Sequence, residues 1–181
     1  MPVWLRNSKP ISKALLAAGL SALNATQALA LSCLPMGPGD VYRIVQQEEE
    51  PFVILEGNVS FDQSLLPQGG KATVEIPSHF NGLMLGQRYF DQQVEGEMLL
   101  EVHCAGGECG SLNSGGRYLV FARQIEGRGV VAVVDPCGSF FFDAIGGRPG
   151  DVVLACHNGG ECPTKLPDSL DEVAPTPPAN N

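Results

Sequence analysis

The sequence has few basic residues and few histidines, and both shortages narrow the functions open to it. It contains 11 lysine and arginine residues against 20 aspartate and glutamate residues, for a formal net charge of −9. A surface this acidic repels phosphate backbones and anionic lipid head groups, so we expect no nucleic-acid partner. Three histidines, two of them beside cysteines, offer little for a catalytic triad, and a Gly-x-Ser-x-Gly elbow is missing. We therefore expect a protein that is not an enzyme.

A second long hydrophobic run is also missing, and the first has the form of a signal peptide. No acidic residue precedes Asp40, basic residues lie near the start, and Ala28-Leu29-Ala30 has the small-x-small pattern of a cleavage site. The apolar stretch from Ile11 to Leu23 is interrupted by Lys13 and is well short of the ~20 residues that a spanning helix needs. Residues 1–30 are therefore predicted to be removed on export, which leaves a periplasmic or secreted protein without a membrane anchor.

One domain is expected in the mature chain. Cleavage after Ala30 leaves 151 residues, with eight basic against twenty acidic residues and a net charge of −12. This length is enough for one domain with its own core, and residues 31–162 carry the strand and helix signals. From Pro163 onward large apolar residues are almost absent, so residues 163–181 are predicted to form a disordered tail.

Six cysteines lie in the mature chain, and an even number in an oxidising compartment predicts disulfides. They are Cys33, Cys104, Cys109, Cys137, Cys156 and Cys162. Zinc is the alternative, because His103 and His157 each adjoin a cysteine pair, and four thiols with two imidazoles are enough for a tetrahedral site. The wide spacing within each pair and the expected compartment favour disulfides. We expect neither a metal nor another cofactor.

Short runs rich in β-branched and aromatic residues, separated by glycine-rich turns, indicate a mainly β domain. The predicted strands span residues 52–61, 71–76, 98–103, 117–124 and 129–134. Pro77 is expected to stop the second strand, and the polar stretch from Gln87 to Glu95 is predicted to be a loop. About five strands predict a small closed antiparallel barrel, since closure removes exposed strand edges.

One or two short helices are expected to flank these strands. Residues 39–45 are predicted to form a helix that has its apolar residues on one face and Asp40 as its cap. Residues 150–155 are predicted to form either a second helix, capped by Asp151, or another strand. The run Phe140-Phe141-Phe142 is expected to pack on the barrel, with a partner-binding patch as the alternative.

Four short segments between residues 31 and 142 follow one another in an order typical of a known family. They are Leu31-Ser32-Cys33-Leu34-Pro35, Glu108-Cys109-Gly110, Gly116-Arg117-Tyr118-Leu119-Val120-Phe121-Ala122 and Val133-Val134-Asp135-Pro136-Cys137. This pattern resembles the netrin-like domains, which include the tissue inhibitors of metalloproteinases. The resemblance implies a five-stranded barrel of the oligonucleotide/oligosaccharide-binding (OB) type with small flanking helices.

The resemblance also implies one disulfide. Cys33 matches the family's second cysteine, whose partner is the family's late cysteine, here Cys137. The remaining four cysteines would then close two local loops, Cys104 with Cys109 and Cys156 with Cys162, although crossed pairings among them stay open.

The mature N-terminus departs from the inhibitors, in which the first residue is a cysteine whose amine and carbonyl chelate the target's zinc. Leu31 stands there in this chain, and no disulfide fixes it, so the segment is not preorganised for zinc. Metalloprotease inhibition is therefore an alternative. The main expectation is a non-enzymatic domain that binds a protein partner. Its expected contact surface combines the loop from Cys104 to Gly110 with an N-terminal edge, formed by Leu31, Ser32, Cys33, Leu34 and Pro35.

Overall fold

The computed structural model describes residue 33 and residues 36–70, 73–145 and 148–163. The predicted signal peptide lies outside these residues, as do the predicted tail from residue 164 onward and every residue of the predicted N-terminal edge except Cys33. Within the described part, no helix is long and apolar enough to cross a membrane.

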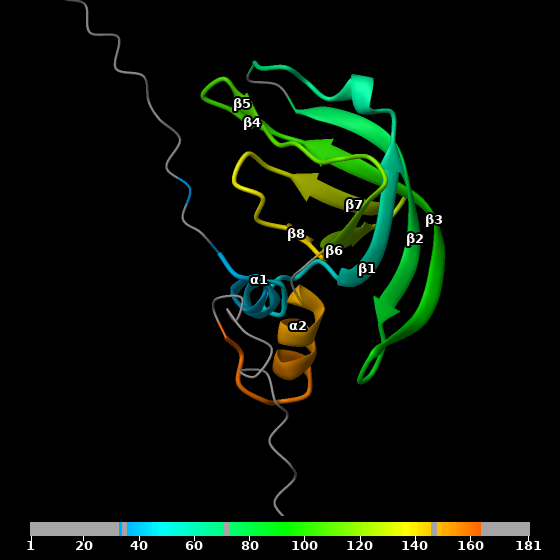
Figure 1. Ribbon diagram of the computed structural model, residues 1–181, viewed down its shortest axis with the longest axis vertical. Coiled ribbons are helices and arrows are strands. Elements are labelled where there is room, and N and C mark those ends of the chain that lie inside the picture. Colours follow the sequence, from blue (N-terminus) through cyan, green and yellow to red (C-terminus); the bar gives the residue numbers. More distant parts are fainter. Residues whose placement is uncertain (1–32, 34–35, 71–72, 146–147, 164–181) are drawn as a thin grey trace, which may run out of the picture.

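The described chain is mainly β, with short helices near its two ends (Figure 1). In order, its elements are α1 (Pro38–Val45), β1 (Phe52–Phe61), a 3-10 helix (Gln63–Leu65), β2 (Val74–Leu85), β3 (Phe90–Val102), β4 (Cys104–Ala105), β5 (Glu108–Cys109), β6 (Gly116–Ile125), β7 (Gly129–Val134), β8 (Phe141–Asp143) and α2 (Pro149–His157). The strands predicted at residues 52–61 and 129–134 match β1 and β7.

Five of the strands form a closed ring in the order β1-β2-β3-β7-β6, and β6 pairs with β1 again. β8 adds to β6 at one end. The expectation of purely antiparallel pairing is wrong at one place, since β3 and β7 run parallel from Leu99↔Val131 to Val102↔Val134. The reason is geometric: in a ring with an odd number of strands, directions cannot alternate all the way round.

The interior of the ring is filled by alternate residues of the five strands, because successive strand residues point to opposite faces. These apolar side chains form one buried cluster with Phe141 of β8: Leu55, Val59, Ile76, Phe80, Met98, Leu100, Val102, Tyr118, Val120, Ala122, Ala132 and Val134. The intervening residues therefore point outward and form the outer face of the ring.

The hairpin of β2 and β3 is longer than the sequence predicts. Pro77 does not end β2, because β1 pairs with β2 only from Ser78 onward, and an open strand edge tolerates a residue without an N–H. Most of the polar stretch predicted as a loop, Phe90–Glu95, is the start of β3. Its side chains are largely exposed, so it lacks the apolar alternation that marks a half-buried strand.

Two helices pack together and cover part of the outer face of β1 and β6. Asp40 is not the N-cap of α1; Gly37 is, and Asp40 reaches back from inside the helix to accept a hydrogen bond from the Gly37 N–H at 3.1 Å. Residues 150–155 are helical rather than extended, and Arg148, not Asp151, is the N-cap of α2.

All six cysteines are joined in three disulfides. Cys33 bonds Cys137, the pairing that the resemblance implies, and the other two bonds close the local loops Cys104–Cys109 and Cys156–Cys162. The thiols that zinc would need are therefore taken up. Among the described residues, no group of three or more His, Cys, Asp or Glu side chains is arranged so that it could hold a metal ion.

Candidate functional site

A pocket of about 520 Å³ opens on the outer face of the ring, where β6 and β7 separate. These strands pair over only three positions, from Ile125↔Gly129 to Arg123↔Val131. Beyond Arg123, β6 pairs with β8 instead, so a space remains beside the outward face of β7. We call this space the outer pocket. It is lined by Glu48, Glu50, Phe52, Glu101, His103, Phe121, Arg123, Val131, Val133, Asp135 and Phe140.

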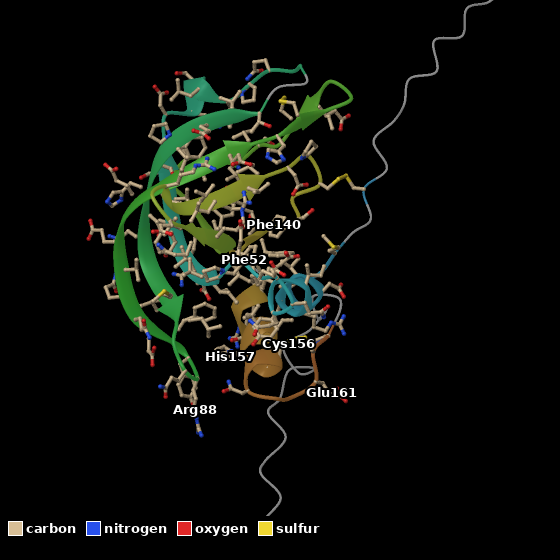
Figure 2. The ribbon with its side chains drawn as sticks, turned by 180° about the vertical axis from the view of Figure 1, so that it is seen from behind. Phe52, Arg88, Phe140, Cys156, His157 and Glu161 are labelled. Atoms are coloured by element: carbon tan, nitrogen blue, oxygen red, sulfur yellow. A yellow bond between two sulfur atoms is a disulfide. The ribbon has the colours of Figure 1, made fainter. Side chains whose placement is uncertain are left out.

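One wall of the outer pocket is aromatic. Phe52, at the start of β1, stacks on Phe140 with 6.3 Å between the ring centroids and 18° between the ring planes (Figure 2). Phe121 is buried below them, and its N–H donates to the carbonyl of Phe140 at 3.0 Å. Phe52 and Phe140 are both half-buried, so part of this apolar surface stays open to solvent.

A tight turn holds the aromatic wall in position. The carboxylate of Asp135 accepts hydrogen bonds from the backbone N–H groups of Cys137 and Ser139, at 2.7 and 3.1 Å, and from the Ser139 hydroxyl at 3.2 Å. The disulfide from Cys137 to Cys33 ties the same turn to the N-terminal segment. Phe140 follows directly, so its position depends on both constraints.

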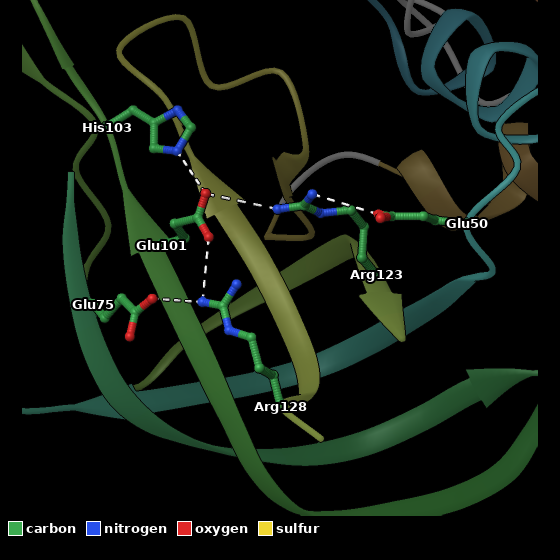
Figure 3. A network of polar contacts seen from close by, with 6 residues as sticks. All are labelled: Glu50, Glu75, Glu101, His103, Arg123 and Arg128. Carbon is green, nitrogen blue, oxygen red and sulfur yellow. Dashed lines mark hydrogen bonds and ion pairs between the residues drawn. The ribbon is translucent and has the colours of Figure 1, made fainter. Parts of the chain in front are cut away.

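The pocket also carries a network of charged side chains centred on Glu101 (Figure 3), and it adjoins the aromatic wall because Arg123 pairs in register with Phe52. His103, two residues along the same outer face, donates from Nε2 to the Glu101 carboxylate at 2.8 Å. Arg123 on β6 approaches the same carboxylate at 3.6 Å, and Arg128 does so at 3.4 Å. The network extends from Arg123 to Glu50 at 3.5 Å.

This network stabilises the charged form of Glu101. The hydrogen bond from His103 lowers the pKa of Glu101 below its ordinary value of 4.5, and the nearby arginines act in the same direction. Partial burial opposes them by raising the pKa, since desolvation disfavours a carboxylate. With a side chain only 16% exposed, Glu101 acts as the ionised hub that holds two arginines and a histidine in place.

The outer rim of the pocket is acidic. Glu48 and Glu50 come from the exposed segment between α1 and β1, and Glu50 is 58% exposed even though it contacts Arg123. In all, four carboxylates line the pocket, against the cations of Arg123 and, when protonated, His103. Because the two arginines of the network are already paired, the pocket presents an excess of negative charge beside its aromatic wall.

The lining offers binding groups, and the nucleophiles among these residues are limited to carboxylates and His103. It contains no serine, threonine, cysteine, lysine or tyrosine. One face is apolar and the other is charged, which is the composition that ligand sites use to combine affinity with orientation.

Those predicted contact residues that the structure describes are not among the residues that line this pocket. Cys33 is exposed and is tied to Cys137; the rest of the predicted N-terminal edge lies outside the described residues. The loop from Cys104 to Gly110 adjoins the same region, because the backbone N–H of His103, the residue before the loop, donates to the Val134 carbonyl at 2.9 Å. Gly110 lies so close to Val134 that a side chain there would clash with its backbone.

The three consecutive phenylalanines serve different purposes. Phe141 is buried in the ring interior, and Phe142 packs edge-on against Phe121 beneath the helices. Phe140 is the one that lines the outer pocket. Core packing was expected for the whole run, and all three side chains pack against the buried clusters. Phe140 also lines the outer pocket, so the partner-facing alternative fits its position alone.

The two histidines that adjoin cysteines make different contacts. His103 belongs to the outer pocket, whereas His157 lies at the end of α2, where its Nδ1 accepts from the Tyr42 hydroxyl at 2.9 Å. The Nε2 of His157 donates to the Gln87 carbonyl at 3.0 Å and so fastens the tip of the β2–β3 hairpin to α2. Figure 2 shows His157 near Arg88 at that tip.

Sequence reasoning missed most of the pocket. Glu48 and Glu50 follow the helix predicted at residues 39–45, and Arg123 lies in the strand predicted at residues 117–124; no local pattern marks any of the three as part of a site. The one usable signal was the pair Glu101 and His103, whose spacing of two puts both side chains on one face of a strand.

Comparisons with known proteins add no relative: no protein-family model matches the chain, and neither the curated proteins nor the solved structures contain a significant match.

Proposed function

We propose that this chain is an exported, non-enzymatic domain that binds a protein partner through the outer pocket. The observation that carries the proposal is the pocket itself, which joins a stacked aromatic wall to a fixed charged network on an otherwise closed ring. Aromatic and arginine side chains in partly enclosed sites are the groups that contribute most at protein interfaces. The lining has no hydroxyl, thiol or amine side chain, which favours binding over covalent catalysis through such a group.

Export is supported by the cysteines. All six are in disulfides, which form and persist in oxidising compartments such as the periplasm and the extracellular space. The signal-peptide pattern of residues 1–30 points the same way. We place the protein outside the cytoplasm on these two grounds.

The proposal includes a finer description of the fold as an OB-type barrel of the netrin-like kind. A closed ring of five strands with helices against its outer face supports this description. The disulfide between Cys33 and Cys137 supports it as well, because it joins the two cysteines that the resemblance pairs.

The test is to capture partner proteins from the native envelope. It compares the wild-type protein with a variant in which the charge at the pocket rim is reversed. Purified wild-type protein and the variant E48K/E50K are each immobilised, and bound proteins are identified by mass spectrometry. The matched control is E95K/E97K, which makes the same change in charge on exposed residues of β3 away from the pocket. We expect a specific protein that wild type and control retain and the pocket variant loses. Equal retention by all three would contradict a role for the pocket.

A further inference from the structure

We infer that the outer pocket receives a basic side chain, arginine or lysine, from an exposed segment of the partner protein. This inference rests on the proposed function and adds the chemistry of the group that is recognised. Three features of the pocket lead to it: the balance of charge, the aromatic wall and the size.

The charge balance favours a cation as the occupant. Arg123 lies between Glu50 and Glu101, at 3.5 and 3.6 Å, so its charge is already compensated inside the pocket. Arg128 is compensated in the same way by Glu75 and Glu101. What faces an incoming group is the exposed rim with Glu48 and Glu50. An anion would be repelled by this rim, whereas a cation would be attracted.

The aromatic wall favours an organic cation with an apolar stem. Phe52 and Phe140 expose part of their stacked rings in the same pocket, where Phe52 is the register partner of Arg123. A guanidinium or ammonium group is attracted to the face of such a ring, and its methylene stem gains from apolar contact. A metal ion would use neither property, and within the described residues no metal-binding group of three side chains exists to hold one.

The size is suited to one long side chain with its adjoining backbone. The volume of about 520 Å³ lies in the range of about 300–1,000 Å³ that is typical of ligand pockets. The lining includes Val131 and Val133 of β7. A side chain that lies along these valines would bring its charged end to the acidic rim, where Glu48 and Glu50 are exposed.

The chain's own composition agrees with a basic partner. The predicted mature protein carries a net charge of −12, so its long-range field attracts positively charged surfaces and speeds their encounter. The pocket would then convert this general attraction into a specific contact at one residue.

The test is titration of isotope-labelled protein with short capped peptides, followed by NMR. The probe is acetyl-Gly-Ser-Arg-Ser-Gly-amide, and its neutral counterpart has citrulline in place of arginine. We expect saturable shifts of the backbone amides of Val133 and Asp135 with the arginine peptide. We expect about tenfold weaker binding of the citrulline peptide, because it lacks the charge for both the rim and the aromatic rings.

Matched variants locate the recognised charge. E48Q/E50Q should weaken the arginine peptide about fivefold, as two exposed charge contacts do, and the effect should shrink as salt is added. E95Q/E97Q should leave the affinity unchanged. Equal binding of the arginine and citrulline peptides, or no saturable shift at millimolar peptide, would overturn the inference.

The outcomes separate this inference from the proposed function. If E48K/E50K loses a captured partner while the arginine peptide does not bind, the pocket is the contact site and its occupant is not a basic side chain. If E48K/E50K captures the same partner as the wild-type protein, the proposed function itself fails, whether or not the arginine peptide binds.

Discussion

The outer face of β1 and β6 has two halves that are built from the same strands and used in opposite ways. In the covered half, Ile54 and Leu119 lie beneath α1 and α2, and both side chains are buried. In the open half, Phe52 and Arg123 stand opposite one another in the strand register and line the outer pocket. Phe121 lies at the boundary and contacts both.

The difference between the halves predicts which changes should affect folding and which should affect the proposed binding. An outward-facing apolar residue is stabilising only when another element covers it, and the helices do this for one half alone. The open half keeps its aromatic residues half-exposed and surrounds them with charge. We therefore expect changes in the covered half to act on folding and changes at the rim of the open half to act on binding.

The largest expected effect comes from two of the three disulfides. Cys33–Cys137 holds the turn before Phe140 of the open half, and Cys156–Cys162 lies next to α2 of the covered half. Removing Cys33–Cys137 by double substitution with serine should lower the free energy of unfolding by about 4.7 kcal/mol, because that bond spans 104 residues. Removing Cys156–Cys162, which spans 6 residues beside α2, should cost about 2.2 kcal/mol. Urea unfolding of both variants under non-reducing conditions measures the two losses. A larger loss for the short loop would contradict the ranking.

The next effect is the loss of packing in the covered half. Leu119→Ala should destabilise the protein by about 2–5 kcal/mol, since Leu119 is fully buried and the cavity cannot collapse between sheet and helices. The half-buried Phe52 provides the comparison: Phe52→Ala should cost less, because part of its ring is already exposed to water. Chemical denaturation measures the loss in free energy of unfolding for both variants. An equal or larger loss for Phe52→Ala would show that the two halves do not differ in stability.

A smaller effect should come from the hub of the charged network. Glu101→Gln should cost about 1–2 kcal/mol at neutral pH, because the charge-assisted contacts with His103 and two arginines are weakened. The folded state lowers the pKa of Glu101, so this stability is present above the ordinary value of 4.5 and is lost as pH falls through the lowered pKa. Unfolding curves between pH 7 and strongly acidic pH should therefore converge for variant and wild type. A difference that stays constant below pH 4 would contradict the ionised hub.

The smallest effect on stability is expected at the rim. Glu48→Gln should change the free energy of unfolding by no more than about 0.5 kcal/mol, since Glu48 is exposed. The same variant should weaken partner binding. Thermal unfolding measures the stability of this variant, and a binding titration measures its affinity for the partner. A large loss of stability with unchanged affinity would contradict the roles assigned to the two halves.

The sequence was informative where local chemistry decides the structure. The bounds of β1 and β7 follow from apolar and β-branched runs between glycine-rich turns, and α1 follows from the spacing of its apolar residues. Local rules failed at Pro77 and at Phe90–Glu95. Whether a proline or a polar run can lie in a strand depends on which neighbouring strand is present and which face is covered.

The pocket could not be read from the chain because it depends on register. Glu101, Arg123 and Glu50 belong to three separate segments, and they meet only because β7 pairs in parallel with β3 and parts from β6 after Val131. A shift of one residue in either pairing would turn Glu101 or Arg123 into the ring interior. No local sequence pattern predicts that these three side chains meet.

The most direct test of the pocket as a contact surface is site-specific photo-crosslinking in the native envelope. A photoreactive amino acid is placed at position 48 on the pocket rim in one variant and at position 97 on β3 in another; both sites are exposed. Our account predicts that irradiation links position 48 to a discrete partner protein and that position 97 gives no such product. The same product from position 97, or products from position 97 alone, would contradict it.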